Sequence, residues 1–126
     1  MPAVYKIDRE RKFVLTTGSG SFNLVDALAH QEALLRDPEF DPTFSQLMDL
    51  TQVTSFDISS ADAHSLAQRT IFAPDSRRAI LVNSDLGFGL SRMFEMLRDN
   101  LGEEGIRVFR NREEASAWVL PLEKSS

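Results

Sequence analysis

The amino-acid sequence of 126 residues contains no cysteine and only two histidines. Without cysteine there are no disulfides, no thiolate nucleophile and no zinc site with sulfur ligands. His30 and His64 fall on different expected helices, share no metal-ligand spacing and lie off the centre of each apolar stripe. We therefore expect both at or near the surface and no metal site. A chain without cysteine suits a reducing compartment, so we expect a cytoplasmic location.

The sequence also lacks any run of about 18 consecutive apolar residues, which a membrane-spanning helix needs. Residues 1–8 include Lys6 and no long apolar stretch, so we expect no secretory signal. Basic residues are in the minority, 14 against 19 acidic ones, and the formal net charge is −5. Such a charge gives no overall positive field for a phosphate backbone. We expect neither membrane insertion nor a nucleic-acid partner.

What the sequence does contain is ordinary for a globular protein. Hydrophobic residues make up 42% and charged residues 26%, which excludes a mostly disordered chain. A chain of this length is long enough for one core, so we expect a single domain over residues 1–126. Residues 122–126 are expected to be a frayed tail.

The first third of the chain predicts a β-hairpin and a helix. Two β-like runs, residues 4–8 and 12–17, flank a charged tetrapeptide that suits an exposed turn. The glycines and serines of residues 18–21 break this pattern. A helix over residues 22–36 follows, because Leu24, Val25, Leu28 and Leu35 recur at helical spacing.

Strands and helices alternate through the rest of the chain. The predicted strands cover residues 44–50, 79–82 and 106–109. The predicted helices cover residues 59–72, a segment from Ser84 or Asp85 to Gly102, and a segment that Asn111 opens. This order predicts an α/β fold: an N-terminal β-hairpin, then alternating helices and strands in a mixed, partly parallel central sheet flanked by helices.

The third predicted helix suggests a contact surface. Its core-facing stripe consists of Leu86, Leu90, Met93, Phe94, Leu97 and Leu101. Phe88 and Met96 point away from this stripe, so we interpret them as exposed and as a surface for a partner protein or a homodimer. The alternative is that Phe88 precedes the regular helix and packs into the loop.

Four segments resemble those of small bacterial STAS-like proteins, which are relatives of the anti-sigma-factor antagonists. These segments are the strand end at residues 47–50, VTSFDISS at 53–60 (interpreted as a turn), GFGLSRMFE at 87–95 and VFRNREEASAW at 108–118. The likeness runs from the opening hairpin to Trp118. It implies a layered STAS-like fold, no cofactor, no catalytic step and a role in binding another protein.

The resemblance also implies a phosphorylation site. The antagonists carry a phosphorylatable serine where the helix after the central strand begins, within an Asp-Ser-Ser/Thr-Gly pattern. The matching stretch here is Asp57-Ile58-Ser59-Ser60-Ala61, with an isoleucine inserted and alanine in place of glycine. Ser59 and Ser60 are therefore the candidate phosphoacceptors, since a phosphate there would meet the positive end of a helix. The alternative is that Ser59 only caps the helix.

Two chemical motifs are incomplete. Gly87 and Gly89 follow a strand, but the third glycine of a dinucleotide fingerprint would fall on Arg92. The glycines therefore indicate a tight entry into the helix, with Arg77, Arg78 and Arg92 supporting a phosphate site as the alternative. No Gly-x-Ser-x-Gly motif supports a serine nucleophile.

Asp49 lies near the end of a predicted central strand, at the sheet edge where open α/β folds bind ligands. The acidic pair and lysine of a response-regulator receiver are missing, so a local turn contact is the simpler interpretation. We expect no catalytic residue. The candidates for a ligand or partner surface are Asp49, Asp57, Phe88, Arg92 and Met96.

Two hypotheses of function follow. The first is a non-enzymatic regulatory protein-interaction module of STAS-like type, controlled by phosphorylation of Ser59 or Ser60. The alternative is a carrier or sensor that binds a small apolar or phosphorylated ligand between the second and third helices. This alternative rests on Phe72, Phe88, Met93 and Met96.

Overall fold

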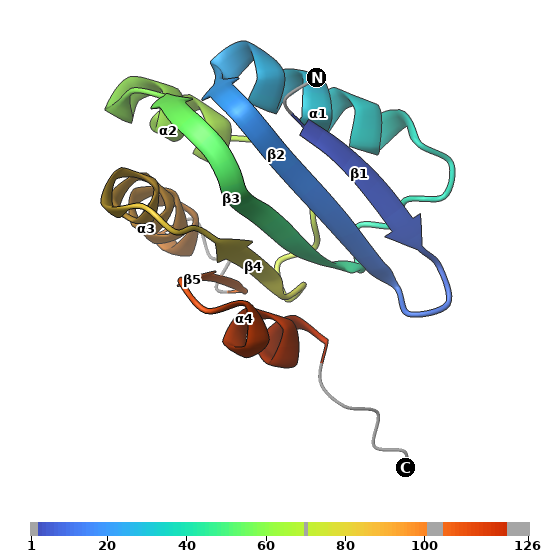
Figure 1. Cartoon of the computed structure of the whole chain (residues 1–126). Coiled ribbons are helices and arrows are strands. Elements are labelled where there is room, and N and C mark those ends of the chain that lie inside the picture. Colours follow the sequence, from blue (N-terminus) through green and yellow to red (C-terminus); the bar gives the residue numbers. More distant parts are fainter. Residues whose placement is uncertain (1–2, 70, 101–104, 121–126) are drawn as a thin grey trace.

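The computed structural model describes residues 3–69, 71–100 and 105–120, which form a five-stranded sheet and four helices (Figure 1). In chain order the elements are β1 (Ala3–Asp8), β2 (Phe13–Asn23), α1 (Leu24–Arg36), β3 (Ser45–Asp57), α2 (Ser60–Ala67), β4 (Arg78–Leu81), α3 (Asp85–Asn100), β5 (Ile106–Phe109) and α4 (Arg112–Val119). The strands lie in the order β1-β2-β3-β4-β5. β1 and β2 are antiparallel, and β2 to β5 are parallel. The predicted hairpin and mixed α/β sheet are confirmed.

Helices cover both faces of the sheet, α1, α2 and α3 on one side and α4 on the other (Figure 1). The alternation of side chains along β3 explains the two cores. Leu50 packs in a cluster with Ala27 of α1 and Leu66 of α2. Leu47, three residues earlier in β3, projects from the opposite face and packs with Ala115 of α4. β3 therefore contributes to two hydrophobic layers, one on each face of the sheet.

β4 is buried along its whole length, as a strand covered on both faces should be. The sequence predicted a strand at residues 79–82, and the observed strand begins one residue earlier, at Arg78. A third cluster packs the C-terminal part of α1 against the sheet. It consists of Val14, Leu34, Phe44, Ile71 and Phe72. Within the parts of the chain that the structure describes, no helix is both long and apolar enough to cross a membrane.

Two strands are longer than predicted. β2 continues through residues 18–21 to Asn23, and β3 continues through residues 53–57. The glycines do not end β2 because the pairing with β3 shifts register around them, and Gly20 takes a positive φ of 66° that glycine adopts without strain. Residues 53–60, interpreted as a turn, are therefore mostly strand.

The predicted helix caps are confirmed. Ser59 Oγ accepts the backbone N–H of Asp62 at 3.0 Å, Ser84 Oγ accepts that of Gly87 at 3.0 Å, and Asn111 Oδ1 accepts that of Glu114 at 2.9 Å. The predicted helix at residues 59–72 was too long, since α2 ends at Ala67.

Several predictions concern residues that lie outside the described ones. These are the helix end at Gly102, the inward position of Leu101 and the frayed tail at residues 122–126. On α3 the predicted stripe is wrong at Leu86, whose side chain is 58% exposed. The buried residues of α3 are Gly87, Ser91 and Arg98. Gly87 lies against Phe56, and Arg98 donates hydrogen bonds to the backbone carbonyls of Ala67 and Arg69.

Candidate functional site

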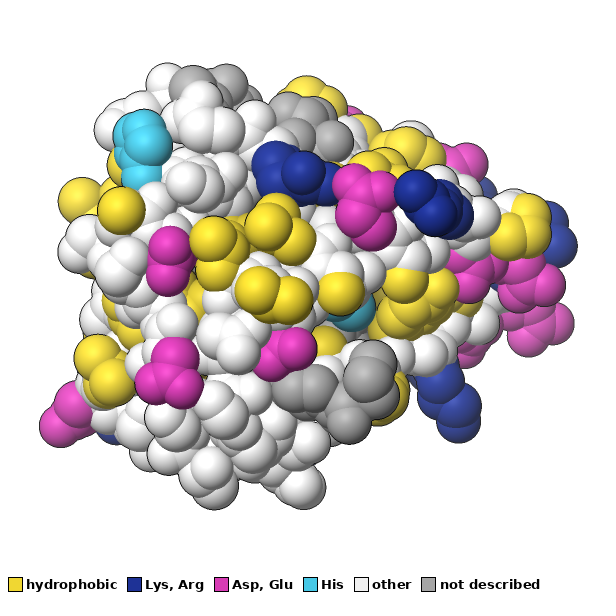
Figure 2. All heavy atoms as spheres, turned by 90° about the horizontal axis from the view of Figure 1, so that it is seen from above, with side chains coloured by type: hydrophobic (Ala, Val, Ile, Leu, Met, Phe, Trp, Pro, Cys, Tyr) yellow, Lys and Arg dark blue, Asp and Glu magenta, His cyan; other side chains and the backbone are white. Residues whose placement is uncertain are grey.

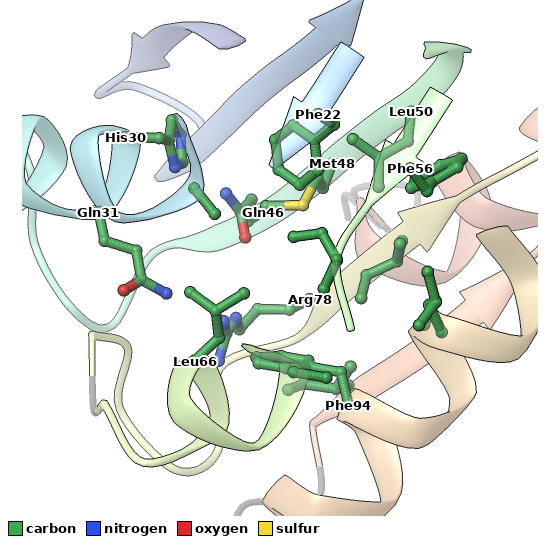
Figure 3. A pocket seen from close by; sticks show the side chains of 17 residues that line it. Phe22, His30, Gln31, Gln46, Met48, Leu50, Phe56, Leu66, Arg78 and Phe94 are labelled. Carbon is green, nitrogen blue, oxygen red and sulfur yellow. The ribbon is translucent and has the colours of Figure 1, made fainter. Parts of the chain in front are cut away.

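A cavity of about 100 Å³ lies between the sheet and helices α1, α2 and α3 (Figure 3). Apolar cavities of about 150 Å³ take up benzene, so this space admits a small apolar group. Its apolar lining consists of Phe22, Ala27, Met48, Leu50, Phe56, Ile58, Ala63, Leu66, Ile80, Leu90, Phe94 and Ile106. Its polar lining consists of His30, Gln31, Gln46, Arg78 and Ser91.

The sheet forms the floor of the cavity. Gln46, Met48 and Leu50 alternate along β3 and so project from the same face. The parallel register places Gln46 beside Arg78 and Met48 beside Ile80 of β4. The two polar side chains of the floor are thus neighbours, and the apolar ones continue from them in one direction.

His30 is part of a buried polar group in the cavity wall. Its Nε2 lies 3.0 Å from Thr16 Oγ1, and Gln46 Nε2 donates to the same hydroxyl at 3.0 Å. Burial and then the positive charge of Arg78 lower the pKa of His30 to about 4, so the imidazole is neutral at pH 7. The prediction of a surface histidine was wrong, since His30 is only 8% exposed. His64 is exposed as expected.

Arg78 brings a positive charge into this largely apolar site. It is only 8% exposed, and its guanidinium carbon lies 4.5 Å from the centre of the Phe72 ring. Among the described residues that line the cavity, it is the only one with a full charge at pH 7. Figure 3 shows its guanidinium beside Leu66, on the side of the cavity where Gln31 and Gln46 also lie.

A close helix approach shapes the opposite wall. A Cβ atom at Gly87 of α3 would lie 2.9 Å from two ring carbons of Phe56, a residue that lines the cavity. At Gly89, two positions further on, a Cβ atom would meet nothing within 4 Å. The predicted tight entry into the helix is therefore found at Gly87.

The candidate phosphoacceptors lie next to the cavity without lining it. Ser59 caps α2 in a complete capping box with Asp62, and Ser60 is the first helical residue; both are exposed. Ile58, directly before them, is part of the cavity wall. Asp57 ends β3 and accepts hydrogen bonds from Ser21 at 2.7 Å and from Ser55 at 3.2 Å.

Asp49 lies on the other face of the sheet. It was expected near a strand end, but it is the fifth residue of the long strand β3, and Arg112 of α4 donates to it at 2.6 Å. Burial alone would raise the pKa of Asp49. Hydrogen bonds from Thr51 and Arg112 outweigh burial and hold that pKa below its ordinary value. This contact fastens α4 to the sheet.

The other candidates on α3 do not line the cavity. Phe88 was expected either to be exposed or to precede the helix and pack into the loop. It instead belongs to α3 and is half-buried against the cluster that contains Leu50, with Arg110 over its ring at 5.3 Å. Met96 is 57% exposed, as expected. Arg92 is exposed and lies 3.8 Å from Glu95. The lining residues from α2 and α3 include Leu66, Leu90 and Phe94. None of the four residues on which the carrier hypothesis rested, Phe72, Phe88, Met93 and Met96, lines the cavity.

The lining residues could not be found by motif. They come from four strands, three helices and the segment before α2, and only their packing brings them together. Two signals were present in the sequence. Ala27, His30 and Leu34 recur at helical spacing and are all buried. Arg78 directly precedes the apolar residues of a buried strand.

The topology defines the class of fold. A hairpin whose second strand lies parallel to β3, followed by alternating helices and parallel strands, is the STAS-like, or SpoIIAA-like, fold. The structure of this chain is similar to the crystal structure of an uncharacterized protein from the DUF3478 family with a SpoIIAA-like fold, from Shewanella loihica PV-4. The two chains are 19% identical, the match covers 93% of each, and the TM-score is 0.53. No protein-family profile and no curated protein matches the sequence.

Proposed function

We propose that this protein is a non-enzymatic binding module that takes up a small, mostly apolar molecule in the cavity beneath α1, α2 and α3, as a carrier or sensor. The observation that carries the proposal is the cavity itself. Ligand pockets in proteins are concave and mostly apolar, and this one, half-open to solvent, has a volume of about 100 Å³ and a mostly apolar lining. Such a lining favours an apolar occupant over water.

The polar groups of the site favour binding over catalysis. The Thr16 hydroxyl lies 3.0 Å from His30 Nε2, but Thr16 is 1% exposed, also accepts a hydrogen bond from Gln46, and is not a lining residue of the cavity. A nucleophile has to reach the substrate. Ser91, His30, Gln31 and Gln46 do line the cavity. We assign to these polar side chains the role of orienting a bound molecule through hydrogen bonds.

The test is a titration with 1-hexanol followed by two-dimensional NMR. We expect saturable shifts at the amides of residues that line the cavity. Ala63→Leu fills part of the space and should weaken binding at least tenfold. Ser65→Leu adds the same bulk on the exposed side of α2 and should leave binding unchanged. Absence of saturable binding to the unaltered protein, or equal binding by Ala63→Leu, would refute the proposal.

A second candidate is the regulatory protein-interaction module that the STAS-like fold suggests. It is supported by exposed apolar side chains on the helices, Val25 at 74% and Leu35 at 46% on α1 and Leu86 and Met96 on α3. Figure 2 looks down on the end of the molecule that carries α1 and α2 and shows hydrophobic side chains gathered near its middle. A protein partner, or a second copy of the chain, would cover such side chains.

Phosphorylation would act at the start of α2. A phosphate on Ser60 would meet the helix N-terminus and leave the Ser59 capping box intact, whereas one on Ser59 would lie beside the Asp62 carboxylate. Ser60 is thus the better acceptor on geometry. Mass spectrometry of protein from its own cells tests this: phosphate on Ser60 supports the switch, and an unmodified chain under all growth conditions rejects it.

A further inference from the structure

Two glutamine amides in the cavity wall are each held through one of their two polar atoms by a residue that does not line the cavity. On α1, Gln31 Oε1 accepts a hydrogen bond from Arg69 Nε at 2.7 Å. On β3, Gln46 Nε2 donates to Thr16 Oγ1 at 3.0 Å. These bonds orient both amides, because an amide oxygen only accepts and an amide NH2 group only donates. The atoms that remain are a donor, Gln31 Nε2, and an acceptor, Gln46 Oε1.

Both remaining atoms face the cavity. Figure 3 shows the amide nitrogen of Gln31 on the cavity side, and the amide oxygen of Gln46 turned away from His30 and into the cavity. Among the residues that the structure describes, no hydrogen bond reaches either atom. Gln46 is only 2% exposed. A buried amide oxygen without a partner costs free energy, so Gln46 Oε1 favours an occupant that donates a hydrogen bond to it.

This pair of atoms disfavours a charged head group. A carboxylate only accepts hydrogen bonds, so it would place an oxygen against Gln46 Oε1. An ammonium only donates, so it would place N–H groups against the NH2 group of Gln31. Arg78 also lines the cavity, but its guanidinium already has interactions within the protein, among them one with the Phe72 ring. We therefore assign no part of the ligand to Arg78.

A hydroxyl meets both amides without conflict. It accepts and donates through a single atom, which makes it the smallest uncharged group that satisfies a donor and an acceptor together. A small head group suits a cavity of about 100 Å³. Figure 3 shows Phe22 and Phe56 on the side of the cavity opposite Gln31, so the rest of the occupant meets apolar surface there.

We infer that the ligand of the cavity is a short-chain alcohol, whose hydroxyl accepts from Gln31 Nε2 and donates to Gln46 Oε1. Its apolar chain lies toward Phe22 and Phe56. This inference rests on the proposed function and names the chemical class of its ligand. Since a cavity of about 150 Å³ holds benzene, a half-open one of about 100 Å³ suits a chain of roughly four to six carbons.

Four ligands of matched size test the inference on the unaltered protein by NMR titration at pH 7: 1-hexanol, 1-methoxypentane, pentanoate and hexylamine. The ether accepts a hydrogen bond but donates none. We expect 1-hexanol to bind at least fivefold more tightly than the ether, because the ether leaves Gln46 Oε1 without a donor. Pentanoate and hexylamine should both bind more weakly than 1-hexanol.

The outcomes separate the inference from the proposed function. Equal affinity for 1-hexanol and 1-methoxypentane would overturn the inference and leave the proposed function standing. Tighter binding of pentanoate or hexylamine than of 1-hexanol would do the same. If none of the four ligands bound, both would fail.

Substitutions to methionine locate the two hydrogen bonds. Gln46→Met removes the acceptor, so 1-hexanol affinity should fall at least fivefold, to that of 1-methoxypentane, and the ether's own affinity should stay within twofold. Gln31→Met removes the donor, so both ligands should bind at least threefold more weakly and 1-hexanol should keep its advantage. Gln52→Met, the same change on an exposed part of β3, is the control and should alter neither affinity.

Either variant can overturn the assignment. A Gln46→Met protein that keeps the full preference for 1-hexanol would do so, as would a Gln31→Met protein that binds both ligands as tightly as the unaltered protein. Gln31 is only half-buried, so Gln31→Met decides the question if Gln46→Met does not fold.

Discussion

Gly87 of α3 lies so close to Phe56 of β3 that a Cβ atom at position 87 would be 2.9 Å from two carbons of the ring. Real Cβ contacts are essentially never this short, so any larger residue has to displace Phe56. Phe56 is part of the cavity wall. The size of the cavity therefore depends on the absence of a side chain at position 87.

The two glycines of α3 give a matched pair of substitutions. Gly89→Ala has open space and should raise the free energy of unfolding by roughly 0.5–1 kcal/mol, because alanine favours the helix. Gly87→Ala should instead lower it by about 1–2 kcal/mol through overpacking against Phe56. Urea unfolding measures both. Gly87→Ala should also weaken 1-hexanol binding, whereas Gly89→Ala should not. Equal stability of the two variants would contradict the packing argument.

Two ion pairs should differ in strength. The Asp49 side chain is 10% exposed and meets Arg112 at 2.6 Å, whereas Asp85 is 98% exposed and meets Arg110 at 3.0 Å. Because Arg112 is itself 56% exposed, we expect Arg112→Met to cost only about 1 kcal/mol. Arg110→Met, the control, should cost a few tenths at most, because the exposed pair is weak and methionine keeps an apolar contact with the Phe88 ring. Chemical denaturation at low and high salt measures both changes, and an equal cost would show that burial of Asp49 does not strengthen its pair.

The sequence predicted the order of elements and the class of fold, but it missed which face of α1 is buried. The apolar residues Val25 and Leu35 suggested one stripe, yet they are 74% and 46% exposed. The buried face consists of Ala27, His30 and Leu34. This face was not recognised because a histidine stands in its middle. The burial of a histidine depends on hydrogen-bond partners that are distant in the sequence.

The cavity could not be predicted for a related reason. Its floor depends on the register between β3 and β4, which sets Gln46 beside Arg78, and no local pattern encodes that register. β2 and β3 were also predicted too short. Glycine and serine at residues 18–21 indicate a turn locally, but long-range pairing with β3 keeps the chain extended.

The capping role of Ser59 separates the two interpretations of the serine pair. Ser59→Ala removes the acceptor for the Asp62 N–H and should lower the free energy of unfolding by about 1 kcal/mol. Ser60→Ala removes no hydrogen bond that holds the cap and should change it by less than about 0.5 kcal/mol. Thermal and urea unfolding of the two unmodified variants provide the comparison. If Ser60→Ala proved the more costly, the capping box would not be what stabilises this end of α2.

His30 makes the stability of the protein depend on pH. The folded state holds the pKa of His30 at about 4, below the 6.5 of the ordinary side chain, so the unfolded state binds the proton more readily. The stabilisation is complete above about pH 6.5 and is lost progressively as the pH falls toward 4. The full difference is on the order of 3 kcal/mol.

The pH dependence can be assigned by substitution. Urea unfolding between pH 7.5 and pH 4.5 should show a decline that His30→Gln largely removes, since glutamine does not titrate and can still bond with Thr16. His64 is exposed, so His64→Gln should leave the decline unchanged. Asp49 has a lowered pKa and loses its contribution only at lower pH, as the pH falls through its folded pKa, so it does not mask the effect. Persistence of the full decline in His30→Gln would mean that the buried imidazole is not its source, and that Thr16 and Gln46 accommodate a charged His30 without loss of stability.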